Sequence, residues 1–292
     1  MSILDGRVSA VVLGIAQDAG VPHAGCRCPR CRAAYSDQNL SLFAASLAIV
    51  DARKDPPSVW LIDATPDVKY QLNLLYDALG SHPTRHDRIR QPDGLFLTHG
   101  HMGHTAGLAH FGPEAMAVQD MKVYCSAGMV SALFGNRLWS PLVESLELIK
   151  IEPYETISLA AGLTIKPVSV PHRDEAGTDT FAYKIEGEKR NLLYLPDIDS
   201  WESWPDARRV LESADVALVD ATFFSSDEIQ GRRPVSHPLV TDTMARFGKV
   251  ANRLVLTHIN HTNPLLDVSG EESQLVESLG VEIAHRGQVF EL

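Results

Sequence analysis

The sequence predicts an α+β protein in which two β-sheets pack face to face and helices cover both outer surfaces, giving four αββα layers. Short β-rich runs lie close together in both halves of the 292 residues, with helical segments interspersed among them. This pattern favours stacked sheets because each sheet must bury one face against another layer. No repeat, low-complexity tract or linker interrupts the chain, so we expect a single domain over residues 1–292.

Each expected strand is a short run of mainly apolar residues bounded by polar, glycine or proline residues. In chain order these runs cover residues 7–15, 44–52, 58–63, 94–99, 163–172, 181–187, 191–197, 215–222, 253–258 and 281–285. The expected helices are segments that mix apolar and polar residues with helical spacing. In chain order they cover residues 66–79, 105–111, 127–134, 206–214, 238–248 and 270–280. Since helices occur in both halves of the chain, they can cover both sheets.

The composition indicates an ordinary globular protein that acts on small molecules. Hydrophobic residues make up 45% of the chain, and 26 basic against 37 acidic side chains give a net charge of -11. No basic cluster could neutralise several phosphates, which argues against nucleic acid and anionic membranes as partners. The apolar run at 8–16 is too short to span a bilayer, so we expect a cytoplasmic protein. A homodimer is compatible with the sequence.

Metal-binding or polar side chains end many of the predicted strands. These side chains are Asp63, His99, His172, Asp197, Asp220 and His258. One such strand end would be unremarkable, but their recurrence predicts that the ends converge on one cleft. Sites at strand ends are common because the sheet holds the geometry while the loops approach the substrate.

The strongest local signal is the segment "THGHMGH", which has H-x-H-x-x-H spacing. Residues two apart in an extended segment point to the same side, so His99 and His101 can hold one ion. His104 would approach from the start of the next helix. Neutral imidazole suits Zn, Mn or Fe, and a carboxylate such as Asp197 could bridge two ions. The alternative is that these histidines are exposed loop residues or hydrogen-bonded orienting residues, which their clustering disfavours.

A second cluster, "GCRCPRC", contains three of the four cysteines. In a cytoplasmic protein, Cys26, Cys28 and Cys31 favour thiolate coordination of a structural zinc over a disulfide framework. We therefore expect an N-terminal zinc knuckle at 26–31. Candidates for a fourth ligand are Cys125, His23 and His261, and the alternative is a group of reactive or simply buried thiols.

These motifs resemble the metallo-β-lactamase superfamily, whose fold is the αββα sandwich. The likeness rests on H-x-H after a strand, followed by later His, Asp and His at strand ends, and it covers nearly the whole chain. The segments "GIAQDAGVPHAGCRCPRC" and "THINHTNPLLD" are similar to one branch of that superfamily. This branch contains pyrroloquinoline-quinone biosynthesis protein B and the phosphodiesterase of the carbon-phosphorus lyase pathway.

The resemblance implies two adjacent metal sites and a structural zinc. The implied ligands are His99, His101 and His172 at the first site, His104 and His258 at the second, and Asp197 as the bridge. Asp63 would orient the ligand histidines from behind. His261 would complete the structural zinc site with the three thiolates. His237, in "RRPVSHPL", matches a histidine that contacts substrate in this branch, so Asp197 and His237 are the expected catalytic residues.

One position departs from the superfamily pattern H-x-H-x-D-H. The aspartate of that pattern ligates the second metal and can protonate a leaving group, but Gly103 stands here. Glycine does neither, so we expect the second site to bind its metal more weakly. The quinone-biosynthesis proteins depart the other way, because they keep the Asp-His end and lose the first two histidines.

Three functions are compatible with this pattern. The leading hypothesis is a metal-dependent hydrolase of a phosphodiester or cyclic ester that uses a metal-activated water. The second is an iron-dependent oxygenase of a small molecule, motivated by the likeness to the quinone-biosynthesis protein. The third is a noncatalytic metal-binding or carrier protein, which the nearly complete ligand set disfavours.

Overall fold

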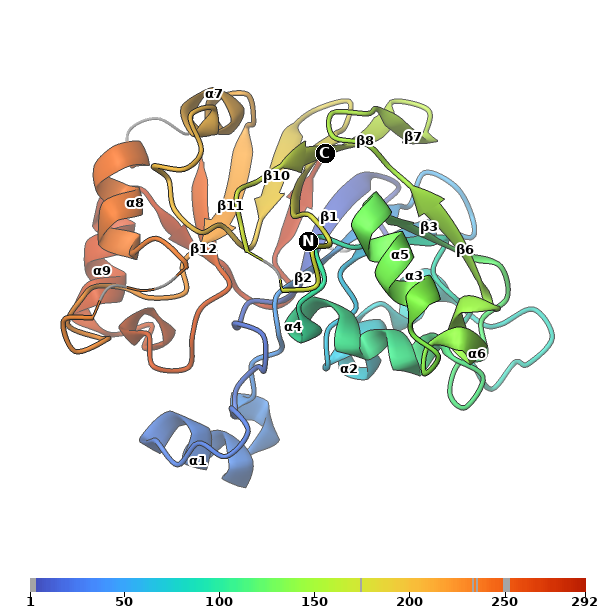
Figure 1. Cartoon of the computed structure of the whole chain (residues 1–292), viewed down its shortest axis with the longest axis horizontal. Helices are drawn as coiled ribbons and strands as arrows, with labels where there is room; N and C mark the ends of the chain where they lie inside the picture. The colour runs from blue at the N-terminus through green and yellow to red at the C-terminus, as the bar shows by residue number, and fades with distance from the viewer. Residues whose placement is uncertain (1–3, 174, 233, 235, 249–252) are drawn as a thin grey trace.

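Two seven-stranded mixed sheets form the centre of the protein (Figure 1). The computed structural model describes residues 4–173, 175–232, 234, 236–248 and 253–292. The first sheet has the order β14-β1-β2-β3-β4-β5-β6 and the second has the order β13-β12-β11-β10-β9-β8-β7. Each sheet therefore combines parallel and antiparallel neighbours.

The strands of the first sheet come from the N-terminal half of the chain, apart from the last strand. They are β1 (Val8–Gly14), β2 (Ser46–Asp51), β3 (Ser58–Ile62), β4 (Gly94–Phe96), β5 (Met121–Cys125), β6 (Leu146–Lys150) and β14 (Val289–Glu291). The strands of the second sheet are β7 (Ile157–Ala160), β8 (Leu163–Ser169), β9 (Phe181–Glu186), β10 (Asn191–Leu195), β11 (Val216–Asp220), β12 (Leu254–Thr257) and β13 (Glu282–Ile283). Strand β14 returns the C-terminus to β1 in antiparallel register.

Helices cover the outer faces of both sheets. Those beside the first sheet are α2 (Val68–Leu74), α3 (Tyr76–Leu79), α4 (Met102–Thr105), α5 (Ala127–Gly135) and α6 (Ser140–Val143). Those beside the second are α7 (Ala207–Glu212), α8 (Val240–Phe247) and α9 (Glu271–Ser278). Helix α1 (Pro29–Ser36) lies at one edge, away from both groups (Figure 1). Short 3-10 turns cover Gln38–Leu40, Ala106–Phe111 and Pro264–Leu266. None of the described helices is long and apolar enough to cross a membrane.

Three apolar clusters hold these four layers together. One lies between the sheets and includes Phe96, Tyr183 and Phe290. A second joins the first sheet to α2, α3, α5 and α6, and the third joins the second sheet to α7, α8 and α9. The predicted αββα architecture is therefore confirmed, with each sheet buried on both faces.

The predicted elements differ from the observed ones mainly at their ends. The helix expected at 66–79 is broken at Leu75 into α2 and α3, and the one expected at 105–111 is a 3-10 turn after α4. Strand β4 ends at Phe96, so His99 and His101 lie in a loop, whereas His104 lies in α4. The sequence reasoning missed β5, β6, β7 and β14, which are short or only partly apolar.

The strand directions place the candidate site residues at one end of the sandwich. Strands β1, β3 and β4 run the same way in the first sheet, as do β8, β10, β11 and β12 in the second. A bridge between Ala16 and Ile259 joins the segments that follow β1 and β12. The carboxyl ends of these strands are therefore close together, as is usual for ligand sites in sheets with parallel strands.

Candidate metal centre

Three histidines form the first ligand group of the site. His99 and His101 lie in the loop after β4, and His172 lies in the segment after β8. The Nδ1 atom of His101 lies 2.9 Å from Nε2 of His99 and 3.4 Å from Nε2 of His172. Three imidazole nitrogens that converge in this way match the donors preferred by Zn²⁺ and similar cations.

Asp197 lies between this group and a second one, which consists of His104 and His258. Its Oδ1 is 3.7 Å from Nε2 of His172, whereas its Oδ2 is 3.0 Å from Nε2 of His104 and 3.4 Å from Nε2 of His258. Asp197 is 2% exposed and follows β10 at the centre of the second sheet. One buried carboxylate therefore has an oxygen facing each group, which is the geometry required to bridge two cations.

The facing atoms of the second group are close together without being hydrogen-bonded. Among the described residues, Nε2 of His104, Nε2 of His258 and Oδ2 of Asp197 have no partner with hydrogen-bond geometry. Buried polar atoms are normally paired, because an unpaired one costs about 1–3 kcal/mol. Their convergence on one point is the arrangement expected of metal ligands.

Asp63 orients two of the histidines, His104 directly and His99 through the hydroxyl of Thr98. It follows β3, is fully buried and accepts a 2.7 Å hydrogen bond from Nδ1 of His104. The hydroxyl of Thr98 donates to Asp63 at 3.0 Å and lies 2.9 Å from Nδ1 of His99. These contacts hold the Nδ1 side of both rings, so Nε2 of each ring is the atom that would bind a metal.

Asp220 repeats this arrangement on the second sheet. It ends β11, accepts from Nδ1 of His237 at 2.7 Å, and accepts from the Thr222 hydroxyl at 2.8 Å. The same hydroxyl lies 3.0 Å from Nδ1 of His258. Each buried aspartate therefore orients one histidine directly and a second one through a threonine.

Burial and the facing charges set the protonation of the cluster. Burial lowers the pKa of His99 well below its usual value, which favours the neutral ring. Burial disfavours the charged form of His104 too, but Asp63 and Asp197 raise its pKa well above the usual value. Burial alone would raise the pKa of Asp197, whereas His258 and His104 hold it well below its usual range. A metal that binds here must therefore displace a proton from His104.

His237 lies beside the cluster with one ring nitrogen uncommitted. Its backbone N–H donates to the Ile198 carbonyl at 3.0 Å, and its Nδ1 is engaged by Asp220. Burial opposes its protonation, but Asp220 and Asp197 raise the pKa of His237 to about 9. The two carboxylates therefore favour the protonated form of the ring.

The cysteine cluster forms a compact four-ligand group with His261. The sulfurs of Cys26 and Cys28 each lie 3.7 Å from Nδ1 of His261, and all four ligand atoms, including that of Cys31, lie within 4.8 Å of one another. The backbone N–H groups of Cys28 and Cys31 point at the preceding sulfurs at 3.4 Å. This Cys₃His set has the composition of a closed structural zinc site.

The pKa values within the knuckle fit this donor set. Burial opposes ionisation of Cys28, but the N–H groups of Cys31 and Arg30 are among the contacts that lower the pKa of its thiol. Burial raises the pKa of Cys31 to about 11, so metal binding would have to displace its proton. Burial and the neighbouring His23 lower the pKa of His261, which favours a neutral ring.

The other two candidates for the fourth ligand, Cys125 and His23, do not belong to this four-ligand group. Cys125 is buried in the apolar cluster behind the first sheet, where burial raises its pKa to about 12. The ring of His23 packs on His261 with centroids 4.8 Å apart, and its backbone N–H donates to the sulfur of Cys31 at 3.3 Å. His23 therefore supports the group from outside.

A family comparison agrees with this geometry. The model of the beta-lactamase superfamily domain matches residues 60–259, which is more than half of the chain. The chain belongs to the metallo-β-lactamase superfamily. The matched segment contains the His/Asp cluster but not the three cysteines of the knuckle.

Full-length relatives and solved structures narrow the likeness within this superfamily. The coenzyme PQQ synthesis protein B of Methylobacterium nodulans is 28% identical, with 98% of this chain and 100% of that protein covered. The Methylococcus capsulatus protein of the same name is also 28% identical, with coverage of 94% and 97%. The zinc-bound PqqB of Methylobacterium extorquens has a TM-score of 0.82 at 24% identity, covering 97% of this chain and 100% of that one. A diphosphatase of the PhnP family has a TM-score of 0.70 at 24% identity, covering 98% of both chains.

Sequence reasoning missed several residues that shape this superfamily site. Thr98 and Thr222 orient ligand histidines, and Asp199 places its Oδ1 3.2 Å from Nδ1 of His172. Asp220 was expected at a strand end but without a role. Asp18, from the segment after β1, lies against His104 and His258. Its only sequence signal is its place in the quoted segment "GIAQDAG".

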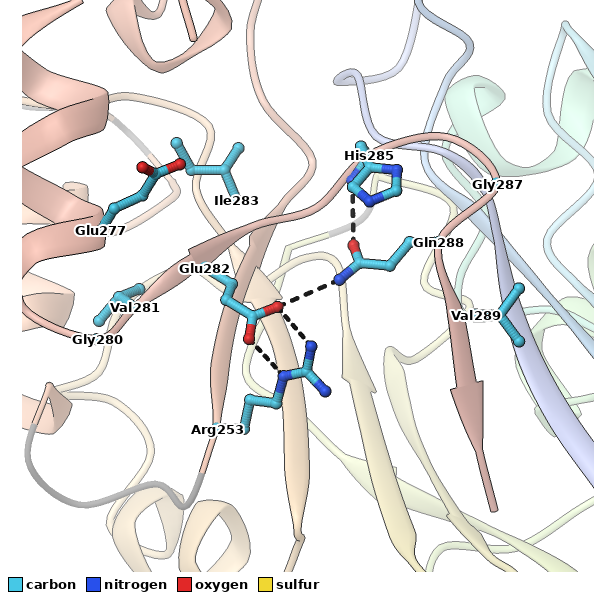
Figure 2. Close-up of a pocket in the computed structure, with 10 residues that line it drawn as sticks. All are labelled: Arg253, Glu277, Gly280, Val281, Glu282, Ile283, His285, Gly287, Gln288 and Val289. Atoms are coloured by element: carbon cyan, nitrogen blue, oxygen red, sulfur yellow. Dashed lines mark hydrogen bonds and ion pairs between the residues drawn. The ribbon is translucent and has the colours of Figure 1, made fainter. Parts of the chain in front are cut away.

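A separate pocket lies along the edge strand β13 and contains none of these residues (Figure 2). Arg253 forms two hydrogen bonds with the Glu282 carboxylate, at 2.5 and 2.7 Å, and Gln288 donates to the same carboxylate at 3.3 Å. These contacts connect β12, β13 and the start of β14. The pocket carries paired charges and no group of converging ligands, so we assign it a structural role.

The threonine hydroxyls provide a first prediction. Thr98→Val keeps the shape of the side chain but removes the link between Asp63 and His99, so metal affinity at the first site should fall about 10- to 100-fold. The measurement is competition with a chelator of known affinity. Thr257→Val is the matched control, because Thr257 also directly precedes a ligand histidine, yet its buried hydroxyl has no hydrogen-bond partner among the described residues. Equal losses in both variants would contradict the role of Thr98.

Proposed function

We propose that the protein is a metal-dependent hydrolase of a small-molecule ester, either a phosphodiester or a cyclic ester. The observation that carries this proposal is the placement of Asp197, whose two oxygens face two ligand groups in one buried cluster. Two adjacent cations that share a carboxylate are typical of hydrolytic two-metal sites. We expect Zn, Mn or Fe in the cluster and zinc in the cysteine knuckle.

Each part of the site has a defined task in such a reaction. A bound metal supplies Lewis acidity, which lowers the pKa of water and polarises the ester. Asp63 and Asp220 hold the histidine rings in the orientation that this requires. His237, with Nδ1 held by Asp220, has Nε2 available to bind an anionic oxygen or to give a proton to the leaving group. The raised pKa of His237 supports a donor role at neutral pH.

One structural neighbour supports phosphate hydrolysis on this fold. A diphosphatase of the PhnP family shares the architecture, although 24% identity carries no substrate assignment. The net charge of -11 makes a small substrate more suitable than a polyanion.

Turnover of a panel of aryl phosphodiesters and lactones by metal-loaded protein tests the proposal. We expect hydrolysis of at least one class, and we expect His101→Ala to reduce it to the background rate, because His101 contributes the Nδ1 at the centre of the first ligand group. Equal rates for the two proteins would show that the activity does not come from this site. Absence of turnover across the panel would contradict the proposed reaction class.

Varying the leaving group of the ester shows whether His237 donates a proton or binds the substrate. If His237 donates a proton, His237→Gln should slow esters with poor leaving groups much more than p-nitrophenyl esters, which need little protonation. A uniform loss across leaving groups would assign His237 to substrate binding instead.

A second candidate function is an iron-dependent oxygenase. It is favoured by the 28% identity to coenzyme PQQ synthesis protein B over the full length of both chains. Histidine and carboxylate ligands with open positions also suit ferrous iron. Substrate-dependent oxygen uptake by ferrous protein, with tyrosine-like and peptide substrates, would support this candidate over hydrolysis. Its absence would count against it.

A further inference from the structure

Gly103 has no room for a side chain. A Cβ atom placed on it would lie 2.5 Å from the Cα of Asp18 and 2.7 Å from its Cβ, with Oδ1 closer still. Separations below about 3 Å require the backbone to shift. The space that the superfamily aspartate would occupy at this position is therefore filled by Asp18, which comes from a distant part of the chain.

Backbone contacts fix Asp18 at this place. The N–H of Ile259 donates to the Ile15 carbonyl at 2.7 Å, and the N–H of Gln17 donates to the Ile259 carbonyl at 3.0 Å. A turn closed by the N–H of Gly20 and the Gln17 carbonyl, at 2.9 Å, follows directly. Asp18 has a φ of 28° within that turn, a strained value that aspartate tolerates better than most residues. The segment is thus held against the loop that carries His258.

The side chain of Asp18 is directed at the second ligand group. Its Oδ1 lies 3.6 Å from Nε2 of His104 and 3.9 Å from Nε2 of His258. Gln17 donates a 3.2 Å hydrogen bond to Oδ2, which leaves Oδ1 facing the histidines. This Oδ1 is buried and has no hydrogen-bond partner among the described residues, like the two nitrogens that it faces. Three unpaired, buried donor atoms within 4.8 Å of one another can share one cation.

We propose that Asp18 is a ligand of the second metal and that Gly103 provides the space for it. The carboxylate missing from the loop after β4 is supplied instead by the segment after β1, so the second site has Asp18, His104, His258 and the shared Asp197. This replaces the expectation of a weakened second site with that of a complete one. The inference concerns metal binding and holds whatever the substrate is, so its failure is distinguishable from failure of the proposed hydrolysis.

The test removes the Asp18 carboxylate and measures metal content and affinity. Zinc per chain is determined by elemental analysis, and affinity by titration against a chelator. Asp18→Gly removes the carboxylate without backbone strain, because glycine accepts the positive φ. Asp120→Gly is the matched control, since Asp120 is an exposed aspartate with a φ of 47° outside the cluster.

In zinc-loaded protein, we expect three ions per chain in the unaltered protein and in Asp120→Gly, and two in Asp18→Gly. The affinity of the second site in Asp18→Gly should fall by at least about 100-fold, more than is typical for residues behind the ligands. Circular dichroism and the thiolate-to-cobalt absorption of the cysteine group report on folding independently of activity. Unchanged zinc content in a folded Asp18→Gly protein would overturn the proposal, as would an equal loss in Asp120→Gly.

Discussion

Asp197→Ala should remove both metals from the His/Asp cluster and leave the zinc of the cysteine knuckle in place. Asp197 is buried, and its oxygens lie 3.0 to 3.7 Å from histidines of both groups. Without it, each group loses a ligand, and no negative charge remains between the two groups to offset that of two cations. Elemental analysis should show a loss of two metals per chain, and ester hydrolysis should fall to the background rate.

Asp206→Ala is the control for this substitution. Asp206 is an exposed aspartate at the start of α7, and its side chain contacts Arg209 rather than the cluster. Metal content and turnover should be unchanged in this variant. A folded Asp197→Ala protein that keeps one cluster metal at full affinity would show that Asp197 serves a single site. That result would contradict the bridging geometry on which the proposed function depends.

The fold and the histidine cluster could be predicted because both follow from local patterns. Apolar runs define strands, and a polar residue that ends such a run is expected at one end of the strands of the sheet. His258 directly follows β12, and His99 lies three residues beyond the end of β4. The elements that were missed are short or half-polar strands such as β6 and β7, whose pairing depends on neighbours far away in the chain.

The residues that contact and orient the ligand histidines could not be predicted in the same way. The tripeptide Leu-Thr-His occurs at 97–99 and again at 256–258. Thr98 connects Asp63 to the following histidine, whereas the hydroxyl of Thr257 has no hydrogen-bond partner among the described residues. The difference arises from tertiary packing, because His258 is oriented instead by Thr222 from another strand end. Asp18 was missed for a related reason, since its partners follow β4 and β12.

Disrupting the cysteine knuckle is also expected to have a large effect on metal binding, because the knuckle lies next to the His/Asp cluster. His261 lies three residues after the cluster ligand His258, and Arg30 donates to the His261 carbonyl at 2.6 Å. The buried residues around the knuckle form a small cluster of four, Ala16, Val21, Cys31 and Ala34. So few apolar contacts hold the segment only weakly, and a metal bound by the knuckle would supply much of its stability.

The double variant Cys26→Ser/Cys28→Ser should therefore lose one zinc per chain and expose the N-terminal segment to protease. Arg27 and Arg32 flank the knuckle ligands and are exposed, so trypsin should cleave there once local structure opens. Cys125→Ala, a change at a buried cysteine outside the knuckle, should keep the zinc and resist cleavage.

Because the segment that carries Asp18 precedes the knuckle and pairs with Ile259, the second cluster site should weaken in the double variant while the His99, His101 and His172 group keeps its metal. Equal losses at both cluster sites would indicate general unfolding instead, and an unchanged zinc count would show that the cysteines do not bind the ion.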